Sequence, residues 1–462
     1  MKSKGVKSGS YWRFNNAGEI NSFLFYLLLI SMIVIPRWYY VERYGLDFPF
    51  YDQWDAEGEG VIHPLLAGNF RFTNLWLTHN EHRVFPTRLI TFFLFKITGV
   101  WSCLSEARFN VMLAASIPVL LIGFMRYKKE LYGFRWLVVL VAVAQFTLPF
   151  GWENLLIGFQ SQFFFLILFA MTGVFLAAMK PDKIWAFVLI FVLSLLSIFT
   201  MASGILMPFT IAGVYIFYAI LLKTNYIKAV TFALLLMLIG IAGYCIMPQV
   251  ENHNKLHAES FEQFFLGLTQ VLSWPAEGNR WIAIPLWLPA VMGIPILVLR
   301  KHFTSSDLVM AGCFAWTLAQ IVAISYGRGH ELAEVTSRYR DLLSLGLVSV
   351  SWFSLRLTYE FRNNIRVGFL MIVLAIGFYS SFVKNHIIRF GNDVRTMKNQ
   401  HALMLVQVGN AVAYYQTRNK SALDKPAFQL PYPDKVRLQQ MLDDSSYCSV
   451  IPLLNRHKTS RN

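Results

Sequence analysis

Charged residues are scarce in this chain. Only 15% of its 462 residues are Asp, Glu, Lys or Arg, whereas a soluble domain carries about a quarter. Hydrophobic residues make up 56%, and apolar runs long enough to cross a hydrocarbon core, roughly 17–25 residues, recur along most of the chain. Short alternating segments of the kind that build a transmembrane β-barrel are lacking. The composition therefore predicts an all-α polytopic membrane protein.

Cysteines, cleavage signals and repeats are also few or absent. Two of the four cysteines fall within apolar runs, and their spacing predicts neither a disulfide framework nor a zinc site. The run from Asn21 to Tyr40 has no small-residue cleavage site, which indicates a retained first helix rather than a removable signal peptide. The absence of an internal repeat disfavours an inverted-repeat transporter.

The net charge of +15 comes from short cationic clusters between the apolar runs. This distribution is typical of topology signals and fits them better than it fits a nucleic-acid-binding patch. No nucleic-acid partner is therefore expected. Lys2, Lys4, Lys7 and Arg13 predict a cytoplasmic N-terminal segment, 1–20.

Counting alternate charge clusters predicts about eleven membrane-spanning helices within a transmembrane domain, 21–383. A first periplasmic loop is expected at 42–106, and a small periplasmic tail at 384–462, with a short helix at Asp434–Asp443. Val84–Val100 is expected to lie at the outer interface as an amphipathic helix; if it spans instead, every later loop inverts. The expected spans are 21–40, 107–125, 136–150, 160–179, 184–200, 204–222, 229–247, 281–299, 307–325, 342–357 and 367–383.

Acidic residues are concentrated in the first loop. Six of the chain's 26 acids lie between Glu42 and Glu59, and the predicted topology gathers them with later polar loops on one membrane face. A carboxylate can accept a proton from an attacking hydroxyl, while arginines hold a leaving phosphate through charge-assisted hydrogen bonds. The candidate catalytic residues are Asp52, Asp55 and Glu81. The candidate donor-phosphate ligands are Arg338, Arg328 and Tyr339, and the candidate acceptor or sugar ligands are His82, Arg83, Glu153 and Gln160.

Each candidate also has a purely structural interpretation. Loop acids serve solvation and topology, Glu81 could pair with Arg83, and an arginine at a span end such as Arg338 is often a snorkelling anchor. Glu153 and Gln160 could join helices by hydrogen bonds. No required cofactor is expected. Binding of a divalent cation is left as an alternative, because carboxylates and imidazoles are available although no calcium-loop spacing is present. Its possible ligands are Asp52, Asp55, Glu57, His79 and His82.

Four short motifs resemble those of the GT-C class of integral-membrane glycosyltransferases. They are Tyr51-Asp52-Gln53-Trp54, Asn80-Glu81-His82-Arg83 with Arg88-Leu89, Gly158-Phe159-Gln160 with Gln162-Phe163, and Ser337-Arg338-Tyr339. The bacterial serotype-converting O-antigen glucosyltransferases are the nearest named group, and the likeness in layout covers roughly residues 20–385.

The resemblance implies sugar transfer, plausibly of glucose, from a polyprenyl-phosphate carrier to a lipid-linked polysaccharide at the periplasmic face of a bacterial inner membrane. It also implies that an acid of the first outer loop serves as the base. Asp52 matches best by position, but the usual second adjacent acid is replaced by Gln53, which leaves Asp52 and Asp55 as alternatives. The rival functions are an O-antigen polymerase or ligase and a lipid-linked sugar transporter or flippase.

Overall fold

The computed structural model describes residues 22–222, 226–248, 250, 255–276, 278–329, 332 and 334–459. Within these ranges the chain is helical and has no β-strand. The longer helices are α1 (Ser22–Tyr44), α3 (Phe85–Thr98), α4 (Cys103–Tyr127), α5 (Trp136–Thr147), α7 (Ser161–Met179), α8 (Ile184–Ile198), α9 (Leu206–Leu222), α10 (Tyr226–Cys245), α12 (Phe261–Ser273), α13 (Ala283–Leu299), α14 (Ser305–Gly327), α16 (Ser344–Glu360) and α17 (Ile365–Thr417).

Shorter helices connect these elements. They are η1 (Trp54–Ile62), α2 (His63–Leu66), η2 (Phe72–Trp76), η3 (Gly133–Arg135), α6 (Trp152–Leu156), η4 (Gly158–Gln160), η5 (Ala202–Ile205), η6 (Arg280–Ile282), α15 (Ser337–Arg340) and η7 (Asp341–Leu343), followed by η8 (Lys420–Ala422), η9 (Ala427–Gln429), α18 (Lys435–Asp443), α19 (Ser445–Ser449) and α20 (Pro452–Thr459).

Nine helices in the described part of the chain are long and apolar enough to cross a membrane, and α5 (with η3) and α8 are shorter apolar helices. This agrees with an all-α polytopic membrane protein; the count of eleven spans stays a prediction. The fourteen-residue helix α3 is in neither group, and it occupies most of the segment expected at the interface.

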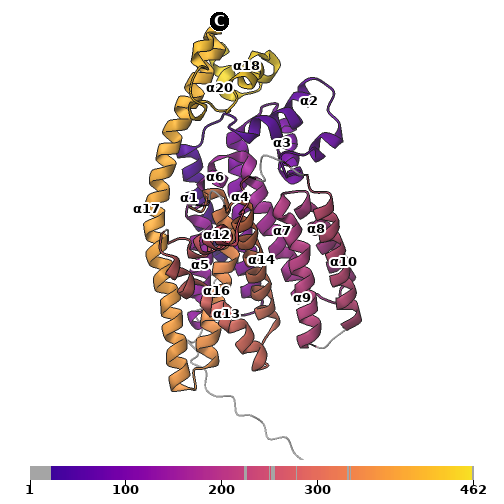
Figure 1. Cartoon of the computed structure of the whole chain (residues 1–462), viewed down its shortest axis with the longest axis vertical. Coiled ribbons are helices and arrows are strands. Elements are labelled where there is room, and N and C mark those ends of the chain that lie inside the picture. The colour runs from indigo at the N-terminus through magenta and orange to yellow at the C-terminus, as the bar shows by residue number, and fades with distance from the viewer. Residues whose placement is uncertain are drawn as a thin grey trace, which may run out of the picture.

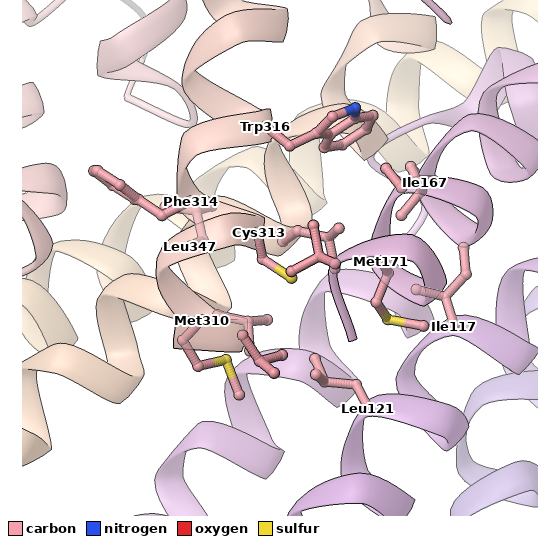
Figure 2. Packing of buried hydrophobic residues seen from close by; sticks show 14 of the residues in the cluster. Ile117, Leu121, Ile167, Met171, Met310, Cys313, Phe314, Trp316 and Leu347 are labelled. Atoms are coloured by element: carbon pink, nitrogen blue, oxygen red, sulfur yellow. The ribbon is translucent and has the colours of Figure 1, made fainter. Parts of the chain in front are cut away.

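The bundle core is made almost entirely of side chains from these helices. The continuous helical segment Ser337–Glu360, which ends with α16, is the most buried of the nine, with 89% of its most apolar 18 residues inside the structure. Figure 2 shows how α14 contributes Met310, Cys313 and Trp316, which face Ile117 of α4 and Met171 of α7. Polar caps fix some helix starts, because a side-chain oxygen satisfies an otherwise unpaired backbone N–H. Thr304 and Asp307, for example, form a capping box at the start of α14.

The C-terminal region differs from the expectation. The predicted tail boundary at 384 falls inside α17, a single helix of 53 residues that is about 80 Å long at 1.5 Å per residue. It runs along one side of the molecule and ends at the shorter helices α18 to α20 (Figure 1). The expected helix at Asp434–Asp443 is confirmed as α18, with Asp434 as its N-cap.

Residues 404–454 form what we call the C-terminal cap, which packs on the first loop to build a second hydrophobic core. Phe48, Trp54 and Trp101 of the first loop lie in this core with Tyr414 of α17 and Tyr447 of α19. The indole of Trp54 stacks on the Tyr447 ring at 5.9 Å. A Cβ on Gly58 would overlap the Tyr447 hydroxyl, so this approach requires glycine. The cap is therefore packed firmly on the first loop rather than being a polar appendage.

Candidate functional site

A cavity of about 320 Å³ lies among the first loop, the beginning of α7 and the segment that joins α14 to α16. Its size falls within the range of small-molecule sites, roughly 300–1,000 Å³. Its lining residues are Asp52, His79, Asn80, Glu81, His82, Phe159, Gln160, Gln162, Phe163, Met201, Leu256, Arg328, Leu332, Thr336, Arg338 and Tyr339.

One side of the cavity, which we call the loop wall, consists of Asp52 and the turn His79–His82. The backbones of His79 and His82 exchange two hydrogen bonds, of 2.7 and 2.9 Å. Asn80 adopts a left-handed conformation with φ of 51°, which Asn tolerates better than most residues. The tight turn brings the His79, Glu81 and His82 side chains to the cavity together.

Arg88 of α3 holds the backbone next to the loop wall by hydrogen bonds. Its Nε donates to the carbonyl oxygen of Ala56 at 2.6 Å, and its Nη1 donates to the carbonyl oxygens of Leu77 and Arg83. Burial lowers the pKa of Arg88 to about 10, so the guanidinium stays charged at neutral pH. One cation thereby joins η1 to both ends of the segment that carries the turn.

Asp52 enters the cavity from a strained position. The preceding residue, Tyr51, has φ of 52°, and the Asp52 carboxylate lies 3.7 Å from His79 Nε2 with its side chain 49% exposed. Burial opposes ionisation, but the close contact with His79 and the positive charge of Arg338 outweigh it and hold the pKa of Asp52 below its usual value. Asp52 is thus a carboxylate at neutral pH, as a proton acceptor must be.

The protonation of His82 is fixed by its surroundings. Its Nδ1 accepts a hydrogen bond of 3.1 Å from the backbone N–H of Ala202, and burial lowers the pKa of the ring to about 4. A neutral imidazole that accepts at Nδ1 carries its proton on Nε2. His82 therefore offers a hydrogen-bond donor and no charge.

The opposite side, which we call the arginine wall, consists of Arg328, Arg338 and Tyr339. Arg328 caps the C-terminus of α14, and its Nε donates to the Tyr339 hydroxyl at 3.1 Å. The Arg338 guanidinium lies 5.4 Å from the centre of the Tyr339 ring. Its buried Nε has no hydrogen-bond partner among the described residues. Two guanidinium groups thus line the same cavity as the loop wall.

Buried polar groups fix the backbone on both sides of Arg338. Glu153 accepts hydrogen bonds from the Ser337 hydroxyl and from the Arg338 N–H, the latter at 3.1 Å. Asn154 donates to the Arg338 carbonyl oxygen at 2.8 Å and to Asp341 at 2.9 Å. Asp341 also lies 3.6 Å from Arg37 of α1. The arginine wall is therefore attached to α6 and α1 within the bundle.

Seven of the ten candidate residues line the cavity: Asp52, Glu81, His82, Gln160, Arg328, Arg338 and Tyr339. Asp55, Arg83 and Glu153 do not, and each contacts protein groups elsewhere. Asp55 accepts a hydrogen bond of 2.8 Å from Tyr432 and lies 2.5 Å from Arg437, so it joins η1 to the C-terminal cap. Arg83 donates to the carbonyl oxygens of Trp76 and Ile246, each at 3.3 Å.

The structure adds residues that the sequence did not predict, such as Met201 and Thr336. Neither belongs to a polar pattern, and no sequence signal marks them. His330 and Glu331, which lie between Arg328 and Arg338 in the sequence, are outside the described residues. Within the described ranges, no group of three or more His, Cys, Asp or Glu side chains is arranged to hold a metal ion.

Comparison with family models, curated proteins and solved structures finds no match to this chain. Its fold class therefore rests on the helices themselves, and its function must be argued from the cavity.

Proposed function

We propose that this protein is a glycosyltransferase that takes a sugar, plausibly glucose, from a polyprenyl-phosphate donor and passes it to a lipid-linked O-antigen or another surface polysaccharide. The observation that supports this proposal is that a carboxylate and two guanidinium groups from distant parts of the sequence line one cavity. Such a site pairs a proton acceptor with an anion-binding surface, as sugar transfer from a phosphate requires.

The proposed reaction is a single displacement. The acceptor hydroxyl oxygen attacks the anomeric carbon and forms the new glycosidic bond while the bond from that carbon to the phosphate oxygen breaks. Asp52 takes the hydroxyl proton, and polyprenyl phosphate leaves with the bonding electron pair. Attack opposite the leaving group inverts the anomeric configuration. Glu81, on the same wall, orients the acceptor or assists the base.

The arginine wall would bind the phosphate. Negative charge on the leaving phosphate grows in the transition state, and preorganised donors stabilise it most where water is excluded. The unpartnered Arg338 Nε is suitably buried for this role, with Arg328 and Tyr339 beside it. The N-terminus of α7, at Gln160–Phe163, also faces the cavity and adds a favourable helix dipole.

The lipid parts of both substrates fit a chain with this many apolar helices. The polyprenyl tail would lie between helices or against their lipid-facing sides. In the proposed orientation the N-terminus is cytoplasmic, and the cavity and C-terminal cap face the periplasm of a bacterial inner membrane. No required cofactor enters this mechanism.

The test compares two neighbouring acids in cells that make the polysaccharide. Asp52→Asn should abolish addition of one side-branch sugar, detected by mass spectrometry of the glycan. Asp55→Asn, the matched control, should retain it because Asp55 contacts the cap and not the cavity. Wild-type-like transfer by Asp52→Asn would contradict the base assignment. Shortened chains with intact branches would indicate a polymerase, and flipping of the carrier lipid without a change in the glycan would indicate a flippase.

A further inference from the structure

Gln162 is a buried side chain that the proposed reaction does not use. It lies in the first turn of α7, is only 3% exposed and lines the cavity. Its Nε2 donates to Gln160 Oε1 at 3.3 Å. Its Oε1 is buried and has no donor among the described residues. A buried acceptor without a partner is costly, and here it adjoins a cavity that a ligand can fill.

The surroundings of Gln162 match the two kinds of surface that a sugar ring presents. The neutral His82 offers a donor at Nε2, so the cavity contains both a fixed donor and a free acceptor. Phe159 and Phe163 lie on either side of Gln162 in the sequence and line the same cavity. Aromatic side chains contact the C–H surfaces of a ring, while amide and imidazole groups bind its hydroxyls.

We propose that the Gln162 amide oxygen accepts a hydrogen bond from a ring hydroxyl of the donor's hexose, and that Gln162 is a specificity-determining residue. This inference rests on the proposed function and adds a residue to it. In this arrangement the arginine wall binds the phosphate, and the Gln162 side chain contacts the sugar. A ligand without a hydroxyl at that point leaves the Gln162 oxygen unpaired, and a site built to pair a hydroxyl rejects such a ligand.

The experiment measures a ratio of affinities in the purified full-length protein in nanodiscs. The probes are farnesyl monophosphate and farnesyl phosphohexoses bearing glucose, galactose, mannose or N-acetylglucosamine. The wild type should bind at least one phosphohexose about tenfold more tightly than the bare phosphate, as expected for one net hydrogen bond. Gln162→Leu, which keeps a similar volume without the oxygen, should bring this ratio close to one while leaving the affinity for farnesyl monophosphate unchanged.

Two further variants separate recognition from folding. Gln162→Glu retains an acceptor oxygen and should retain the preference for the phosphohexose. Gln270→Leu removes a buried amide of α12 that does not line the cavity, and it should behave as the wild type. A preserved ratio in Gln162→Leu, or a wild type that prefers none of the hexoses, would overturn the inference.

A wrong phosphate site would give a different result from a wrong sugar contact. Arg338→Gln should weaken binding of every probe, including farnesyl monophosphate. If the wild type binds no probe at all, the phosphate site itself is wrong, and the inference about Gln162 falls with it. If farnesyl monophosphate binds through Arg338 but Gln162→Leu changes nothing, the phosphate site stands and only the sugar contact is refuted.

Discussion

The two walls of the cavity are built in different ways. The loop wall depends on turns, with left-handed backbone at Tyr51, Asn80 and Val84. The arginine wall follows directly from the end of α14 and the short helix before α16, and none of its residues adopts such a conformation. Strained backbone persists only where surrounding structure holds it. The comparison indicates that the Asp52 side of the loop wall depends on contacts made from outside the bundle, and the arginine wall on contacts within it.

The outside contacts of the loop wall come from the C-terminal cap. The Tyr51 N–H donates to the Pro431 carbonyl oxygen at 2.8 Å, and Gln407 of α17 donates to the Tyr51 hydroxyl at 3.3 Å. The left-handed residue just before Asp52 is thus held at both its backbone and its side chain. The position of the proposed base is set by residues more than 350 positions away in the sequence.

The largest effect on the loop wall is expected from Arg88→Met. The substitution leaves three carbonyl oxygens without their donor, and hydrogen bonds to a buried charge each contribute about 1.5–3 kcal/mol. We expect the free energy of opening of residues 52–88 to fall by about 5 kcal/mol, measured by hydrogen exchange, with the bundle helices little changed. Arg83→Met, the control, should cost about 1 kcal/mol. Equal loss of protection in α14 and α16 would contradict the independence of the two walls.

Asp341→Asn should act on the arginine wall instead. It leaves Arg37 as a buried cation without its carboxylate, and breaking such a pair costs about 3 kcal/mol. Because the pair lies inside the bundle, the thermal unfolding midpoint of the whole protein should fall. The exposed acid Asp424, paired with Lys435 at 2.7 Å, provides the control, since a solvent-exposed ion pair contributes little to stability and Asp424→Asn should leave the midpoint unchanged. A loss confined to the first loop would refute the assignment of this contact to the bundle.

The loop wall should also respond to pH through Glu57 of η1. Burial raises the pKa of Glu57 to about 7, against hydrogen bonds with Gln53, the neighbouring carboxyl of Glu106 and Thr91, and against the charge of Arg88. A folded-state pKa above the unfolded value means that the folded state binds more protons, so this group's contribution to stability is full below about pH 4.5 and is lost as the pH rises through 7.

Glu57→Gln should therefore remove that loss and raise stability at pH 8 by about 2 kcal/mol relative to the wild type. The measurement is the thermal unfolding midpoint of the first loop and the C-terminal cap between pH 5 and 8. Glu59→Gln, at a more exposed acid beside His63, should leave the pH slope intact. An unchanged slope in Glu57→Gln would show that Glu57 is not the group responsible.

The smallest effect should come from the turn itself. Asn80→Ala places a β-carbon at φ of 51° without the local hydrogen bonds of an Asn side chain, at a cost of about 1 kcal/mol. Asn80→Gly should be nearly neutral because glycine adopts this conformation freely. Urea unfolding of the two variants distinguishes them. If both are equally destabilised, the Asn80 side chain matters at the cavity rather than for the backbone.

The membrane helices could be predicted because apolar length alone encodes them. Most boundaries of the expected spans lie within a few residues of the observed helices, as with 184–200 and α8 (Ile184–Ile198). The extension of α17 to Thr417 was missed because residues 384–417 are polar on average. Their signal was helical spacing: Met397, Met404, Val408, Ala411 and Tyr414 form one buried face.

The site could be predicted only in part. Charge counting placed the acidic loop and the arginine loop on one face, but no sequence pattern gives the distance between them. The choice between Asp52 and Asp55 could not be made, since acids three apart lie close together on a regular helix. Here the left-handed Tyr51 and the π-helix that begins at Trp54 send Asp52 to the cavity and Asp55 to the cap.

The second core joins residues 48–103 to residues 404–454. During synthesis, the segment that carries Asp52 leaves the ribosome long before its packing partners exist. This core therefore cannot close until the C-terminal cap has been translated and has reached the first loop. The backbone that positions Asp52 is held in place only once the cap has packed on it, so maturation of the proposed site is tied to the arrival of residues 404–454.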